Sequence, residues 1–247
     1  PIATLPIAFL AGALAGMVTG LLNTALGIPG ILASILTQIS LYSINLNIMG
    51  KANQPVSVDN YPLVVSLRYV TDGSVSRLLF FLGMIVFLLA LIAVMYWYFG
   101  TEQGHAIRAK GCNSNMARAQ GINTNFIKVL ALMISNGLVG LCGALYGQFQ
   151  GASDVNMGRG AIVIGLAAVI IGEVLFGKFA SKRKLAFAFT LASVILGAVI
   201  YYMVYQFVLW LKMPSEDMKL FSAIVVAIFL AIPYLKEKRT LRKGASK

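Results

Sequence analysis

The chain has 247 residues, of which 59% are hydrophobic and only 11% are charged. With a mean hydropathy of +0.83 it cannot cover one core with a water-soluble surface, so the composition excludes a soluble globular domain and predicts an all-α, polytopic helical membrane protein. The net charge of +12 would suggest a nucleic-acid partner for a soluble chain. In a membrane protein such charge marks cytoplasmic loops, so we expect membrane lipid and no nucleic acid as its partner.

Six stretches are long and apolar enough to be spanning helices, which need about 20 mostly apolar residues. They are residues 6–26, 78–99, 127–150, 161–177, 185–211 and 217–235. A seventh stretch, 30–48, follows a turn containing Gly27, Pro29 and Gly30 and carries Ser, Thr, Gln, Tyr and Asn side chains. Because polar groups are costly in lipid, we expect this stretch to be a broken, re-entrant or cavity-lining helix in contact with water or protein.

These stretches follow one another without a large soluble insertion, so residues 1–247 are interpreted as a single transmembrane domain that ends in a basic tail, 236–247. Pro1 stands directly before an apolar run, without an initiator methionine. We therefore expect the domain to have further N-terminal sequence, and we regard the number of spans as a lower bound.

Lysine and arginine are concentrated in three segments, with four in 100–128, four in 178–184 and six from 236 onwards, which makes fourteen of the twenty. The connections 51–77, 151–160 and 212–219 hold the other six basic residues against five acids. The positive-inside rule places the first group in the cytoplasm, together with the C-terminus, and the second group outside. No Lys or Arg precedes residue 50, so the orientation of the first two stretches stays open.

Small residues recur at helical spacing in two of the predicted spans. Gly12, Gly16 and Gly20 form one ladder, and a second one contains Gly137, Gly140, Gly143 and Gly147. Such ladders allow two helices to approach closely. They are explained either by static packing or by faces that slide during a transport cycle.

Residues 105–125 form a polar, basic island between two long apolar helices. The helix-forming run from Met116 to Gln120 ends at Gly121, which predicts a short helix at the membrane surface followed by a glycine turn. One interpretation is a docking surface for another protein. The other is an ordinary solvated loop that its charge holds in the cytoplasm.

Several motifs resemble the permease subunits of bacterial ABC importers of the branched-chain amino acid and ribose type. They are the segment 108–123, with Arg108, Gly111, Asn113, Met116, Ala117 and Gly121, and three apolar segments, 41–50, 135–145 and 165–173. The resemblance covers essentially the whole chain and is closest to a subgroup described as tryptophan or tyrosine transport permeases. In that family the island is the cytoplasmic coupling segment.

The resemblance implies a pair of permease copies, most simply a homodimer, with cytoplasmic ATPase subunits docked on the coupling helices and an extracellular or periplasmic binding protein that delivers the solute. It also implies a location in the bacterial inner membrane. The coupling residues carried over are Arg108, Gly111, Asn113, Met116, Ala117, Arg118 and Gly121. The basic side chains either pair with acids of the ATPase or only retain the loop in the cytoplasm.

The chain has no Gly-x-x-x-x-Gly-Lys-Ser/Thr motif, so we expect ATP and Mg²⁺ in a partner subunit, no cofactor in this chain and no enzymatic activity of its own. We expect no catalytic or metal-binding residues. Polar side chains in the spans are candidates for the translocation path of a solute such as tryptophan or tyrosine: Asn23, Thr24, Gln38, Tyr42, Asn136 and Gln148. The alternative is a secondary transporter or channel for a small solute, although Glu173 is the only clear ionisable residue in a predicted span.

Overall fold

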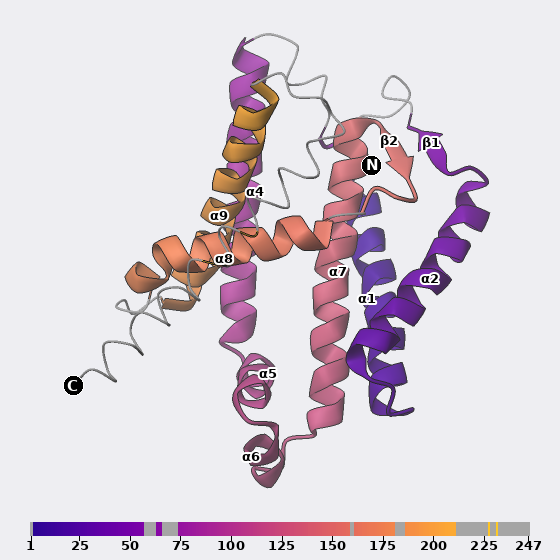
Figure 1. Ribbon diagram of the computed structural model, residues 1–247, viewed down its shortest axis with the longest axis vertical. Coiled ribbons are helices and arrows are strands. Elements are labelled where there is room, and N and C mark those ends of the chain that lie inside the picture. The colour runs from indigo at the N-terminus through magenta and orange to yellow at the C-terminus, as the bar shows by residue number, and fades with distance from the viewer. Residues whose placement is uncertain are drawn as a thin grey trace. The chain divides into compact units, whose positions relative to one another are not determined.

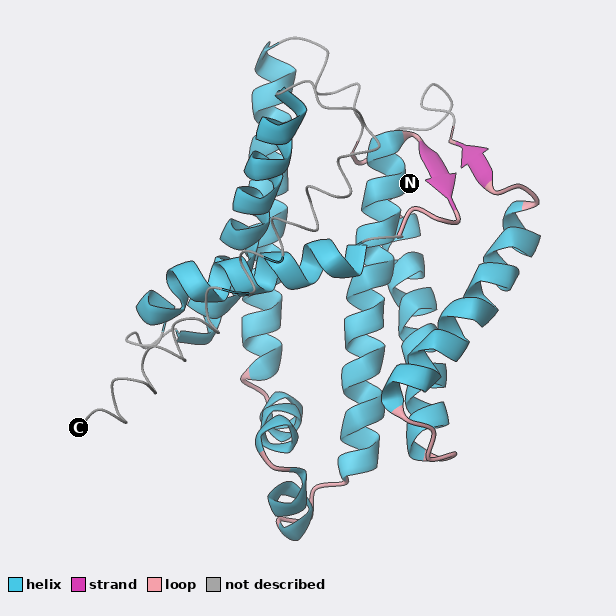
Figure 2. Cartoon of the chain, in the orientation of Figure 1, coloured by secondary structure: helices cyan, strands magenta, loops and turns pink. Residues whose placement is uncertain are grey.

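A computed structural model describes residues 2–56, 63–65, 74–158, 161–180 and 186–210, together with the isolated positions 227 and 231. In this part of the chain almost every residue is helical (Figure 2). Within these described residues, five helices are long and apolar enough to cross a membrane: 4–24, 30–49, 77–99, 124–150 and 187–207. The polytopic helical fold is therefore confirmed. The predicted span 217–235 and the tail 236–247 lie outside the described residues, apart from those two isolated positions.

The chain divides into two compact units, residues 1–158 and 159–247. In Figure 1 the first unit contains α1 (Thr4–Thr24), α2 (Gly30–Met49), β1 (Asn53–Pro55), α4 (Ser74–Phe99), α5 (Glu102–Cys112), α6 (Ser114–Ala119), α7 (Thr124–Gln150) and β2 (Ala152–Asp154). The second unit contains α8 (Ala161–Ala180) and α9 (Ala186–Trp210).

The predicted glycine ladder of the first span is the surface on which α1 packs against α7. A Cβ atom added at Gly12 would collide with the backbone oxygen of Asn136, and one added at Gly16 would collide with that of Leu132. One turn further along, Gly20 faces Val129. Because the partner's number falls as the glycine's number rises, α1 and α7 are antiparallel. This backbone-to-backbone approach is what small residues permit in a membrane, where close packing holds helices together.

The stretch 30–48 is not broken, because α2 runs as one continuous helix from Gly30 to Met49. Three of its polar side chains are satisfied within the helix, since the hydroxyls of Ser34, Thr37 and Ser40 donate to carbonyls four residues earlier, at 2.9 Å each. The break lies just before the helix, in the turn from Ala25 to Pro29. There the Asn23 side chain donates to the Ile28 carbonyl at 2.7 Å.

The helices α1 and α2 are joined by a buried hydrogen bond between two hydroxyls. Thr19 donates to Thr37 at 2.9 Å, and both side chains are buried. Because α1 is antiparallel to α7 and α2 returns from the turn that ends α1, α2 runs in the same direction as α7.

A two-stranded antiparallel ladder was not predicted. It pairs Asn53 with Asp154 and Gln54 with Ser153, and it is extended by a bond of 2.8 Å from the Val56 amide to the Gly151 carbonyl. The ladder connects the segments that follow α2 and α7. Both segments were assigned to the external side from their charge, and their pairing places them at the same end of the unit, opposite α5 and α6 (Figure 1).

In the second unit α8 packs against α9 through a similar small-residue contact. A Cβ atom at Gly172 would collide with the Ser193 carbonyl, and one at Gly197 would collide with the Ala168 carbonyl. A small core of Ala167, Ile171 and Tyr201 lies beside this contact. The two helices are therefore antiparallel neighbours. Among the described residues, the predicted span 185–211 is matched by the spanning helix 187–207, whereas the predicted span 161–177 is matched by a shorter apolar stretch, Ile164–Phe176.

Candidate functional site: the polar island and the cavity beside it

The polar island folds as two short helices, of which only the second was predicted. The first, α5, begins at Glu102 and is capped by Thr101, whose hydroxyl accepts a bond of 3.4 Å from the Gly104 amide. Gly104 is buried, and a Cβ atom at this position would collide with the backbone of Phe99. The first turn of α5 thus packs closely on the last turn of α4. The Thr-Glu pair that starts the helix was a usable signal, because such residues favour helix N-termini.

The second helix, α6, has a cap at each end. The Asn113 side-chain oxygen accepts bonds of 3.1 Å from the amides of Asn115 and Met116. At the other end Gly121 has φ +79°, and the amides of Gly121 and Ile122 donate to the carbonyls of Arg118 and Ala117. This pattern is a Schellman motif, which favours glycine at the left-handed position. The predicted short helix and its glycine turn are confirmed.

The side chains of α6 point in different directions. Met116 is 64% exposed, whereas Ala117 is 3% exposed. Space around a Cβ at Gly121 or at Gly111 is open. Within this protomer, therefore, Ala117 is small because it is packed against the protein, while Gly121 is required by its backbone conformation. Met116 is the large apolar side chain that α6 presents outwards.

One hydrogen bond ties the island to the span that follows it. The Arg118 guanidinium donates to the hydroxyl of Thr124 at 3.2 Å, and Thr124 is a buried residue in the first turn of α7. The Asn123 side chain caps the same helix by accepting from the Phe126 amide at 3.1 Å. The end of α6 and the start of α7 are therefore joined through side chains as well as through the chain. Arg108 is exposed on α5.

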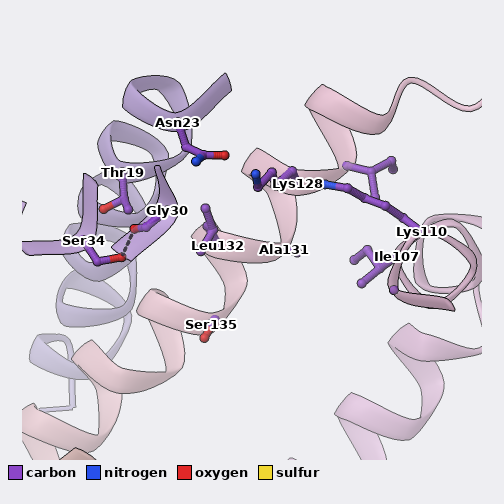
Figure 3. A pocket seen from close by; sticks show the side chains of 12 residues that line it. Thr19, Asn23, Gly30, Ser34, Ile107, Lys110, Lys128, Ala131, Leu132 and Ser135 are labelled. Carbon is purple, nitrogen blue, oxygen red and sulfur yellow. Dashed lines mark hydrogen bonds between the residues drawn. The ribbon is translucent and has the colours of Figure 1, made fainter. Parts of the chain in front are cut away.

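A cavity of about 540 Å³ lies beside the island, where α1, α2, α5 and α7 meet. Figure 3 shows the side chains that line it, which are Thr19, Asn23, Ser34, Ile107, Lys110, Ile127, Lys128, Ala131, Leu132 and Ser135, with Gly30 and Gly111. Of these, Asn23 and Gly111 were predicted as site residues. The cavity-lining prediction for the stretch 30–48 is confirmed at Gly30 and Ser34.

One of the two lysines of this cavity has a perturbed pKa. Partial burial lowers the pKa of Lys110 from its usual range, and the neighbouring positive charge of Lys128 lowers it further. The sequence alone indicates the cytoplasmic side for Lys128, and for Lys110 either that role or pairing with acids of an ATPase. Their convergence depends on the packing of α5 against α7, which no local pattern reveals.

The other predicted path residues lie at different levels of the first unit. Gln148 is buried at the opposite end, where its amide donates to Thr4 at 2.8 Å and its oxygen accepts from the Val64 amide at 3.1 Å. Thr24 and Asn136 donate to carbonyls four residues earlier in their own helices, at 2.7 and 2.9 Å. Gln148 thus holds the N-terminal end of α1 to the C-terminal end of α7.

Gln38 and Tyr42 lie instead on an exposed face of α2. With Ser34 and Asn45, which are also exposed, they follow the i, i+4, i+8, i+11 spacing of one stripe. This stripe is the clearest group of exposed polar side chains on a described helix that is long enough to span a membrane. Lipid tails cannot satisfy such groups, so water or protein is expected to cover the stripe.

Residues 1–233 match the family model described as "Branched-chain amino acid transport system / permease component". A tyrosine transport system permease protein of Clostridioides difficile is 39% identical over 94% of this chain and 72% of its own length. An uncharacterised protein of Rickettsia prowazekii is 29% identical over 91% of this chain and 76% of its own. The inner membrane ABC transporter permease protein YjfF of Escherichia coli is 25% identical over 71% of this chain and 52% of its own.

No solved structure matches the chain. The family match extends over nearly the whole sequence and confirms the resemblance that the motifs carried. Permease subunits of ABC systems are not enzymes themselves, and they work with ATPase and solute-binding partners. The chain belongs to the family of branched-chain amino acid transport system permease components and is a multi-pass membrane protein of an ABC transport system.

Proposed function

We propose that this chain and a second copy of it form the translocation path of an ATP-driven importer for an aromatic amino acid, tyrosine or tryptophan. The single observation that carries the choice of solute is the 39% identity to a tyrosine transport system permease protein over 94% of the chain. A separate ATPase dimer would supply ATP hydrolysis, and an extracellular binding protein would deliver the solute. The complex would lie in the bacterial inner membrane with the C-terminal tail in the cytoplasm.

The coupling segment in this proposal is the island 105–125, and its contacts support a mechanical role. The exposed Met116 on α6 provides an apolar side chain for a groove on the ATPase. Movement of α6 would pass to α7 through the short connection and the Arg118–Thr124 hydrogen bond. Since α7 is locked against α1 by backbone contacts at Gly12 and Gly16, the two helices would move together.

The polar stripe of α2 is the proposed wall of the translocation path. Ser34, Gln38, Tyr42 and Asn45 offer hydroxyl, amide and aromatic groups along one face, and all four are exposed in the protomer. Two such stripes facing each other across a homodimer would enclose a path with polar walls. Tyr42 adds an aromatic ring on which a tyrosine or tryptophan side chain could stack.

The test is uptake of radiolabelled amino acids by cells that depend on this transport system. We expect saturable uptake of tyrosine or tryptophan that collapses when ATP is depleted, and a loss of about tenfold for Tyr42→Ala, because one lost aromatic contact of about 1.4 kcal/mol changes affinity by that factor. Ile39→Ala is the matched control, since Ile39 is exposed on α2 outside the stripe. Uptake driven by an ion gradient in ATP-depleted cells would show a secondary transporter instead.

A further inference from the structure

The cavity beside the island gathers positive charge without any acid to balance it. Lys110 comes from the last turn of α5 and Lys128 from the second turn of α7, and both side chains line the cavity in Figure 3. None of its twelve lining residues is an aspartate or a glutamate. Two like charges that share a partly enclosed space repel each other, and an anion between them removes that cost.

Further groups around the cavity fit an oxygen-rich anion. Gly30 is the first residue of α2, and no side chain caps the N-terminus of this 20-residue helix. Its first amides therefore lack partners within the helix, and the helix dipole favours negative charge at this point. The Asn23 side chain donates to the Ile28 carbonyl, which leaves its own oxygen buried without a hydrogen-bond partner. A buried acceptor of this kind suits a hydroxyl group of a ligand.

The size and lining of the cavity indicate more than a free ion. Its volume of about 540 Å³ is in the range of sites for organic ligands. Ile107, Ile127, Ala131 and Leu132 give it an apolar wall next to the lysines. A ligand with a charged phosphate, a hydroxyl and an apolar part matches these groups.

We propose that this cavity binds a phosphodiester headgroup, and that the headgroup belongs to an anionic phospholipid of the cytoplasmic leaflet, of the phosphatidylglycerol type. The phosphate lies between Lys110 and Lys128, a headgroup hydroxyl donates to Asn23, and the glycerol and acyl part follows the apolar wall. Basic cavities between helices at the cytoplasmic surface attract such headgroups, because that leaflet is negatively charged. The bound lipid bridges α5 and α7, so it stiffens the link between the island and the span. This inference does not depend on which solute is transported.

The test is native mass spectrometry of the full chain purified from nanodiscs that contain either phosphatidylglycerol or phosphatidylcholine. Wild-type protein should retain phosphatidylglycerol and release phosphatidylcholine. Lys110→Gln and Lys128→Gln should each weaken retention about fivefold, the factor expected for one basic residue near a lipid headgroup. Lys128→Arg keeps the charge and should retain the lipid. Lys51→Gln removes one exposed charge at the opposite end of the unit and should behave as wild type.

A second arm separates lipid from a soluble source by adding inorganic phosphate to protein stripped of lipid. One result would be that inorganic phosphate binds with the same dependence on Lys110 and Lys128 in protein that does not retain phosphatidylglycerol. That result would support the phosphate site but overturn a lipid as the source of the phosphate. If wild type and both glutamine variants retained phosphatidylglycerol equally, the site itself would be overturned. The same conclusion would follow if Lys51→Gln lost as much phosphatidylglycerol as the two glutamine variants of the cavity. Circular dichroism of each variant shows whether it is folded. If a glutamine variant does not fold, lipid retention by Lys128→Arg still tests whether the positive charge at position 128 is what binds the headgroup.

Discussion

At the scale of single residues, the close approach of α1 and α7 depends on glycines that tolerate no side chain. We expect Gly16→Ala to destabilise the protein by about 1–3 kcal/mol, since the added methyl group would collide with the backbone of Leu132 and the two helices would have to separate. Unfolding of the purified protein in increasing SDS, followed by circular dichroism, measures this change.

The matched control for this substitution is Gly143→Ala in α7, where the space around a new Cβ is open. Alanine has the higher helix propensity, so this variant should be unchanged or stabilised by up to about 1 kcal/mol. Equal destabilisation by both substitutions would mean that the α1–α7 contact is not the one described.

A second prediction at this scale concerns the hydroxyl pair that joins α1 to α2. Thr37→Val keeps the shape of the side chain but removes its hydroxyl, so we expect a loss of about 0.6 kcal/mol and no more than about 1.7, as for other hydrogen bonds between membrane helices. In the double variant, Thr19→Val should add little to the destabilisation caused by Thr37→Val, because both changes break the same hydrogen bond. Ser40→Ala is the control, since this exposed hydroxyl bonds only its own helix.

At the scale of elements, the proposed coupling helix α6 has six residues and depends on its caps. Asn113→Ala removes the acceptor of two amides and should weaken the helix by about 1 kcal/mol. In the proposed importer this loosens the docking surface, so we expect reduced ATPase association in a pull-down while membrane insertion stays normal. Asn115→Ala changes a neighbouring exposed asparagine without removing a cap, and undiminished binding by both variants would argue against a docking role for α6.

The apolar elements could be predicted from the sequence, because length and hydropathy alone define a spanning helix. The island was only partly predictable. The caps of α6 are local signals at Asn113 and Gly121, whereas α5 has no apolar periodicity and is fixed at Gly104 by contact with the end of α4. The ladder of β1 and β2 could not be predicted either, because each strand has only three residues and depends on a partner strand about a hundred positions away in the sequence. The hydrogen bond from Gln148 to Thr4 is equally non-local, so the sequence could not reveal it.

At the scale of the whole molecule, the charge pattern predicts that the island faces the cytoplasm. Cys112 is exposed at the end of α5 and gives a direct test in a Cys142→Ala background. A membrane-impermeant maleimide should label Cys112 in inside-out vesicles and leave it unlabelled in intact spheroplasts. In a cysteine-free chain, Lys51→Cys at the opposite end of the first unit should show the reverse pattern. Labelling of Cys112 from outside would invert the topology.

The proposed function requires this permease component to couple to a separate ATPase through the island. The most direct measurement is to place a photocross-linking amino acid at Met116, purify the chain from its native membranes after irradiation, and identify the cross-linked protein by mass spectrometry. Coupling through α6 predicts a stoichiometric ATPase subunit linked at position 116, and no such link from a probe placed at Lys51. A chain that is purified alone, without a cross-link at position 116, would contradict this coupling and favour a transporter that works without an ATPase.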